Sequence, residues 1–176
     1  MIDSLEKINL DFNENYQAIF NAPKLTQKYL NKRSDKYEQI IINEFKTRKL
    51  EDDFAIVALG GYGRQELFPS SDIDLSIIQL SKKSKKIEDV KNFIGWLWTL
   101  NVKIGHSVRT FKDINKITKS DLKEFTSYLS HRVIYCKEDK ISQLSLNLKK
   151  ISNNWNKTKF FNCLLYTSPS PRDTNP

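Results

Sequence analysis

The chain of 176 residues carries 29 Lys and Arg against 21 Asp and Glu, a formal net charge of +8, and 39% of its residues are hydrophobic. That size and composition suit one domain with flanking helices, and a run of about 18 apolar residues that could span a membrane is absent. Without a signal-peptide pattern at the start, and with two scattered cysteines, the chain is expected to be cytoplasmic. The positive charge comes mostly from lysines spread along helix-like segments, which favours a solvated surface over nucleic acid as a partner.

The first half of the chain predicts helices followed by two strands. Residues 1–50 are expected to form an N-terminal helical segment, because apolar residues recur at helical spacing and Pro23 fits the start of a helix. The apolar run that ends at Leu59 is followed by two glycines, which is typical of a fully buried strand. Residues 73–80 predict a second strand.

The second half predicts a helix, a strand and another helix. Apolar spacing indicates a helix over 87–100, strict alternation indicates a strand over 102–111, and Ser120 resembles the cap of a helix that runs to 136. We therefore expect an α+β fold: a small mixed sheet with Ala55–Leu59, Ile73–Leu80 and Val102–Thr110 as neighbours, and helices 87–100 and 120–135 packed on it.

The domain organisation follows from these elements. Residues 51–136 form the expected domain, and 137–163 form a helical extension. Residues 164–176, "LLYTSPSPRDTNP", are rich in proline and show no helical or strand period. We expect this tail to be disordered and to pack against nothing, either as a linker or as a non-native sequence similar to translated sequencing adapters.

Two aspartates stand one residue apart at the start of the second predicted strand. Asp72 and Asp74 would lie on one face of the strand, with Cα atoms about 6.6 Å apart at a rise of about 3.3 Å per residue. Two adjacent carboxylates repel each other, and a hard cation such as Mg²⁺ relieves that repulsion while binding substrate phosphates. An ordinary capping or solvated Asp pair is the alternative.

Two glycines follow the first predicted strand. Gly60 and Gly61 allow the backbone to approach a ligand closely, and successive N–H groups in such a turn can bind an anion. Arg64 could add a fork of donors to a phosphate. A plain turn is the alternative, but a strand, two glycines, two aspartates and another strand form a more specific combination than either pair alone.

The blocks "GGYGRQELFPSSDIDL" and "LWTLNVKIGHSVRT", with a weaker match at "SDLKEFTSYLSHR", resemble the DNA polymerase β-like nucleotidyltransferase superfamily. Within it, they are similar to the nucleotidyltransferase domain of the bacterial PII uridylyltransferase family. The resemblance implies that Asp72 and Asp74 are catalytic and bind Mg²⁺, that Gly60 and Gly61 hold the nucleotide's phosphates, and that Arg64, Ser70 and Ser71 line the triphosphate. It also implies transfer of UMP from UTP to a tyrosine of the PII signal protein, with release of pyrophosphate.

The chain departs from the family pattern at several positions. A third carboxylate is expected from a later strand, but 102–111 contains none, and the nearby Asp113 and Asp121 leave it unassigned. Ser130 stands where a glutamate is expected, and Gln65 where a glycine is common. The later phosphohydrolase and glutamine-sensing domains of the family cannot be placed in this sequence, so the chain is interpreted as an N-terminal piece.

Further residues leave alternatives open. Arg109 shares a face with Lys103 and Ser107 and is a candidate nucleotide-binding residue, while a role outside the site is the alternative. His106 lies on the apolar face of its strand, which favours a structural role over that of a catalytic base. At the level of function, the alternatives are a related transferase with another nucleotide or acceptor, and a catalytically idle regulatory or interaction module.

Overall fold

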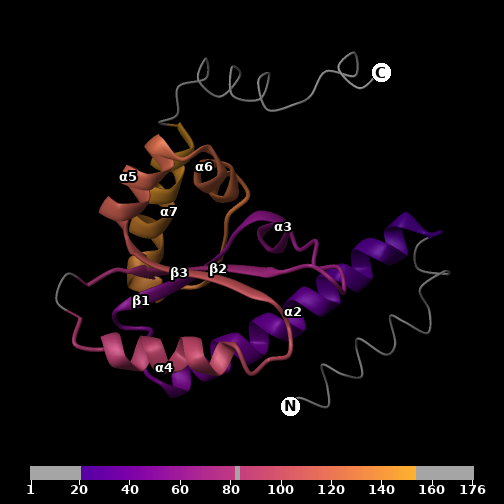
Figure 1. The fold of residues 1–176 in the computed structure, drawn as a ribbon, viewed down its shortest axis with the longest axis horizontal. Helices are drawn as coiled ribbons and strands as arrows, with labels where there is room; N and C mark the ends of the chain where they lie inside the picture. Colours follow the sequence, from indigo (N-terminus) through magenta and orange to yellow (C-terminus); the bar gives the residue numbers. More distant parts are fainter. Residues whose placement is uncertain (1–20, 82–83, 154–176) are drawn as a thin grey trace, which may run out of the picture.

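The computed structural model describes residues 21–81 and 84–153, and these form a four-stranded mixed sheet with helices on both faces (Figure 1). The predicted α+β architecture is confirmed, and it is consistent with a nucleotidyltransferase fold. The predicted tail at 164–176 lies outside the described residues. None of the helices in the described ranges is both long and apolar enough to cross a membrane.

The sheet has the strand order β3-β2-β1-β4. Its strands are β1 (Phe54–Ala58), β2 (Ile73–Gln79), β3 (Ile104–Thr110) and β4 (Arg132–Tyr135). β1 pairs antiparallel with β2 and with β4, whereas β2 and β3 are parallel. The predicted neighbours β1, β2 and β3 are therefore confirmed, and β1 and β2 are buried between the two helical layers.

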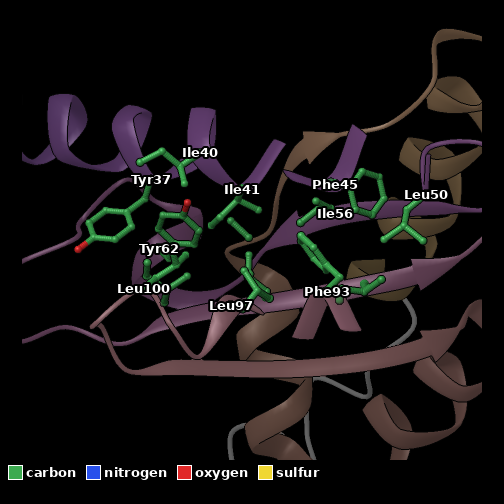
Figure 2. Close-up of a cluster of buried hydrophobic side chains, with 14 of the residues drawn as sticks. Tyr37, Ile40, Ile41, Phe45, Leu50, Ile56, Tyr62, Phe93, Leu97 and Leu100 are labelled. Carbon is green, nitrogen blue, oxygen red and sulfur yellow. The ribbon is translucent and has the colours of Figure 1, made fainter. Parts of the chain in front are cut away.

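One face of the sheet is covered by α2 (Pro23–Thr47) and α4 (Ile87–Leu97) (Figure 1). Pro23 is at the start of α2, as predicted. α4 provides the long crossover that two parallel strands require. Figure 2 shows the apolar cluster between these helices and the sheet, to which α2 contributes four residues, namely Tyr37, Ile40, Ile41 and Phe45. The N-terminal helix is thus part of the same core as the sheet.

The other face is covered by α5 (Phe111–Ser120), α6 (Leu122–Leu129) and α7 (Glu138–Asn153) (Figure 1). α7 buries Leu144, Leu148 and Ile151 in a second apolar cluster on this side. α7 thus occupies residues 138–153 of the segment 137–163 that was expected to be a helical extension.

The helix predicted over 120–135 is wrong in extent. Ser120 is the last residue of α5, Asp121 caps the shorter α6 by accepting a hydrogen bond from the Glu124 N–H, and the segment from Arg132 forms β4. The predicted apolar positions fit a helix locally, but residues 132–135 instead satisfy the backbone groups of β1, a partner far away in the sequence. α5 was not predicted.

Candidate active site

Asp72 and Asp74 lie at the beginning of β2. Asp72 immediately precedes the strand and Asp74 is its second residue. Both are exposed, whereas Ile73 and Leu75 are buried against the face covered by α2 and α4. Because alternate residues of a strand share a face, Asp74 is directed away from the apolar face, to the side of the sheet that carries α5 and α6.

Two glycines leave space around the Asp74 carboxylate. A Cβ atom placed on Gly60 would lie 3.6 Å from Asp74 Oδ2, and one placed on Gly105 would lie only 2.4 Å from Asp74 Oδ1. Gly105 is the residue that pairs with Asp74 across the parallel strands. A side chain at position 105 would displace the carboxylate, so the glycine leaves room for the orientation that Asp74 adopts.

The environment of Asp74 raises its pKa above the ordinary value for an aspartate. Partial desolvation of the carboxyl by its neighbours is the first cause and the negative charge of Asp72 is the second, while the positive charge of Lys123 acts in the opposite direction. An acid in this position is stabilised in its charged form by a nearby cation, so the pair is suited to binding a metal ion.

The glycine turn between β1 and β2 forms the short helix α3 (Gly60–Gly63). Gly60 has a φ of +56°, a conformation that glycine adopts readily. A Cβ atom on Gly63 would lie 1.8 Å from the backbone oxygen of Ser130, so the turn packs directly on the chain that precedes β4. From β4, Arg132 donates to the carbonyl oxygens of Tyr62 and Gly63.

Arg132 also pairs with Glu38 of α2. Two guanidinium nitrogens contact the two carboxylate oxygens, with the shortest separation 2.5 Å. A planar guanidinium matches a carboxylate in this two-bond geometry. The carbonyl end of α3 is therefore held by an ion pair that joins α2 to β4.

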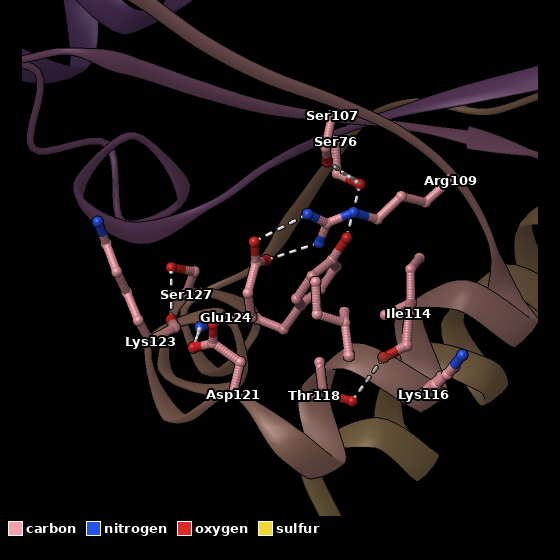
Figure 3. A network of polar contacts seen from close by, with 12 residues as sticks. Ser76, Ser107, Arg109, Ile114, Lys116, Thr118, Asp121, Lys123, Glu124 and Ser127 are labelled. Atoms are coloured by element: carbon pink, nitrogen blue, oxygen red, sulfur yellow. Dashed lines mark hydrogen bonds and ion pairs between the residues drawn. The ribbon is translucent and has the colours of Figure 1, made fainter.

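A hollow of about 440 Å³ opens beside Asp74, between β3 and α6. Figure 3 shows the polar network on this side, in which the Arg109 guanidinium donates to both oxygens of Glu124 at 2.6 and 2.8 Å. This contact raises the pKa of Arg109 and lowers the pKa of Glu124. Behind it, the hydroxyl groups of Ser76 and Tyr128 are 2.7 Å apart and buried.

Comparison with known proteins assigns the family. No family model matches the chain. Curated relatives named bifunctional uridylyltransferase/uridylyl-removing enzyme do match: one from Pseudoalteromonas translucida is 35% identical over 125 residues, covering 68% of this chain and 14% of the relative. One from Haemophilus influenzae is 34% identical over 133 residues, with 74% and 15% covered. One from Pseudomonas aeruginosa is 29% identical over 163 residues, with 91% and 18% covered.

The chain belongs to the family of bifunctional uridylyltransferase/uridylyl-removing enzymes. It spans less than a fifth of the length of these relatives. At the level of the family, the name supports nucleotidyl transfer, and the two aspartates with the glycine turn are the part of this segment that suits such chemistry.

Other residues that the family resemblance implies for the triphosphate either pair with a neighbouring side chain or line a different hollow. Arg64 is exposed, pairs with Glu66 at 2.7 Å and donates to the Ser130 hydroxyl at 3.2 Å. Ser70 and Ser71 line a separate hollow of about 300 Å³, together with Arg33, Asn101 and Lys103. Their assignment to the triphosphate stays a prediction.

The backbone at Gln65 adopts a conformation that suits the glycine expected there from the family resemblance. Gln65 has a φ of +60°, in the left-handed region that glycine favours. Its side chain donates to Asp35 of α2 at 3.1 Å. The left-handed turn at this position is thus formed by a residue whose side chain reaches α2.

A third metal-binding acid is not gathered at the site. Asp113 caps α5 together with Thr110, Asp121 caps α6, and Glu124 is paired with Arg109. Within residues 21–81 and 84–153, no group of three or more His, Cys, Asp or Glu residues could hold a metal ion. The donors that are present fit Mg²⁺ bound by two carboxylates and substrate phosphates, rather than a cage of protein ligands.

His106 is exposed on β3 and borders the hollow beside Asp74. It shares the alternation of Ile104 on β3, and its ring meets the ring of Trp98 edge to face, with centroids 5.6 Å apart. The structural role of His106 stays a prediction. Trp96 stacks on Phe93.

Proposed function

We propose that this chain is the metal-dependent nucleotidyltransferase segment of its family. It moves UMP from UTP to a tyrosine hydroxyl of the PII signal protein and releases pyrophosphate. The observation that carries the proposal is the Asp74 carboxylate, exposed beside Asp72 and left uncovered by Gly60 and Gly105. Such a pair of acids, next to a backbone turn that a phosphate can approach, is suited to transfer at phosphorus.

In this proposal Asp72 and Asp74 hold Mg²⁺, which when bound offsets the negative charge of the phosphates. The half-buried backbone of Gly60 and Gly61, which carries no side chain, lets the triphosphate approach closely. The phenolic oxygen of the acceptor forms a bond to the α-phosphorus, the bond from that phosphorus to the bridging oxygen breaks, and the phenolic proton is released. Lys123, whose charge already acts on Asp74, contributes to the positive potential at the same place.

A catalytically idle module is the second candidate. The specific observation in its favour is that Glu124, the acid of the hollow beside Asp74, is held by Arg109 through two hydrogen bonds. A related transferase with another nucleotide or acceptor differs from the first proposal only in its substrates.

The experiment is transfer of label from α-³²P-UTP to PII in the presence of Mg²⁺, with the other three nucleoside triphosphates as a panel. Asp74→Asn is expected to lower transfer by about 100-fold or more, because it removes one of two charges that bind the metal. Asp89→Asn, a substitution in the exposed first turn of α4, is the matched control and should leave transfer unchanged.

Each outcome separates the candidates. A preference for another nucleotide would replace UTP in the proposal and keep the chemistry. Label transfer that survives Asp74→Asn would overturn the metal assignment. A folded chain that transfers no label from any nucleotide, and binds no divalent metal, would favour the idle module.

A further inference from the structure

α2 carries an arginine whose burial is unusual for its charge. The side chain of Arg33 is only 2% exposed and is among the largest fully buried side chains of the described residues. A guanidinium ion loses strong hydration when it is buried, and this cost has to be offset by hydrogen bonds. The contacts of Arg33 therefore indicate what the burial achieves.

Those contacts are with the backbone that leads to the aspartate pair. Nη1 donates to the carbonyl oxygens of Leu67 and Phe68 at 3.1 and 2.5 Å, and Nη2 donates to that of Pro69 at 3.4 Å. The guanidinium carbon also lies 5.4 Å from the centre of the Tyr37 ring. One side chain thus holds three consecutive peptide carbonyls.

The next residues lie between this anchor and the first hydrogen bond of β2. The Ser71 N–H donates to the Phe68 carbonyl at 2.9 Å, which closes a turn on one of the carbonyls that Arg33 holds. The Ile73 N–H donates to the Lys103 carbonyl at 2.8 Å, where β2 starts. Asp72 lies between these two points, before the strand begins.

We propose that Arg33 is a positioning residue of the metal site, which orders residues 67–71 so that the Asp72 carboxylate is held beside that of Asp74. This inference rests on the proposed function, because it concerns the same two acids. A guanidinium presents several donors in a fixed plane, whereas an ammonium is a point charge. Lysine at this position should therefore keep the charge and lose the arrangement.

The test measures binding of Mn²⁺ by electron paramagnetic resonance, for the chain and for Arg33→Gln and Arg33→Lys. Both variants are expected to raise the Kd for Mn²⁺ by about 10-fold, the usual scale for residues that orient metal ligands. Arg48→Gln is the matched control: Arg48 caps the C-terminus of the same helix, pairs with Glu44 at 2.6 Å, and its substitution should leave the Kd unchanged. All measurements are made well below the melting temperature of each variant.

A second readout separates positioning from general stability. If Arg33 acts on a metal ligand, excess Mn²⁺ restores most of the lost label transfer, because the weakened site is filled by mass action. Loss through partial unfolding would follow the melting temperature instead. If Arg33→Gln fails to fold, Arg33→Lys decides the question.

The possible failures are distinguishable. An unchanged Kd in a folded Arg33 variant overturns the inference, while wild-type transfer that Asp74→Asn abolishes leaves the proposed function standing. A wild-type chain that binds no Mn²⁺, or that binds it as well after Asp74→Asn, overturns the metal site and the role of Arg33 with it.

Discussion

The two faces of the sheet differ in chemistry although the same strands form both. Towards α2 and α4, β2 presents Ile73, Leu75 and Ile77 to an apolar core. Towards α5, α6 and α7, the intervening positions of β2 are Asp74, which borders the hollow, Ser76, whose hydroxyl contacts that of Tyr128, and Ile78, which joins the smaller apolar cluster. The first face supplies most of the apolar burial, so we expect substitutions there to affect stability and substitutions around α6 to affect function.

Among the substitutions that test this difference between the two faces, Phe93→Ala is expected to have the largest effect on stability. Phe93 is fully buried on the apolar face and packs edge to face against Phe45, with ring centroids 5.5 Å apart. Removing the ring should lower the free energy of unfolding by about 3–5 kcal/mol. Urea denaturation measures it, and a loss below about 1 kcal/mol, the scale of an exposed substitution, would mean that this face is not the main source of stability.

The next largest effect is expected for Glu124→Gln on the polar face. The variant loses a two-bond ion pair with Arg109 that is mostly covered, and the free energy of unfolding should fall by about 1–2 kcal/mol at neutral pH. Because the pairing lowers the pKa of Glu124, its stabilisation is present above the ordinary pKa of a glutamate and is lost as the pH falls through the lowered value.

Unfolding curves recorded from neutral to acidic pH check this prediction. The difference between wild type and Glu124→Gln should shrink as the pH falls, at constant ionic strength. A difference that stays constant down to strongly acidic pH would mean that the contribution of Glu124 does not depend on its charge.

Gly105→Ala tests the polar face more directly, because it should weaken metal binding and leave the free energy of unfolding nearly unchanged. The added Cβ atom would lie 2.4 Å from Asp74 Oδ1, so the carboxylate has to turn away, which we expect to weaken Mn²⁺ binding by about 10-fold. The unfolding free energy should change by less than about 1 kcal/mol, since a flexible side chain can move.

Gly95→Ala is the control for this substitution. Gly95 is in α4, and a Cβ atom there would have no atom within 4 Å. Alanine in place of glycine inside a helix should raise stability by about 0.5–1 kcal/mol and leave metal binding unchanged. Equal effects of the two alanines on Mn²⁺ binding would remove the special role of Gly105.

The smallest effect on stability is expected for Asp74→Asn. Since burial and Asp72 raise the pKa of Asp74 in the folded chain, the ionised carboxylate destabilises the fold, and stability falls as the pH rises from the ordinary pKa through the raised one. At neutral pH the asparagine variant should therefore melt at the same temperature as the wild type or slightly higher. A marked decrease would show that Asp74 is a structural acceptor.

Three of the four strands could be predicted from the sequence because each has a local pattern of apolar residues that is typical of a strand. Residues 54–59 are an unbroken apolar run and 104–110 alternate strictly, and both patterns predict strands without any knowledge of their partners. β4 could not be found in this way, because its helical-looking spacing is overridden by pairing with β1, about 75 residues earlier in the chain.

The candidate site could also be predicted only where its residues form a local pattern. Asp72 and Asp74 follow from a spacing of two in a strand. Gly105 becomes significant only when β3 is placed in register beside Asp74, although an isolated glycine in a predicted strand was a usable signal. In the sequence, Arg33 is one polar position within the predicted N-terminal helical segment. Its hydrogen bonds to the carbonyl groups of Leu67, Phe68 and Pro69 depend on how that helix crosses the loop, which the sequence pattern does not give.

The central position of β1 has a consequence for how the sheet assembles. β1 pairs with β2 soon after it in the chain, but its other edge is covered by β4, which comes only after α4, β3, α5 and α6. Until β4 arrives, a fully apolar strand exposes one row of backbone groups, and closing so long a loop is slow. Transient association of nascent chains through β1 is expected in that interval, and Arg132, which joins β4 to Glu38, forms part of the contact that ends it.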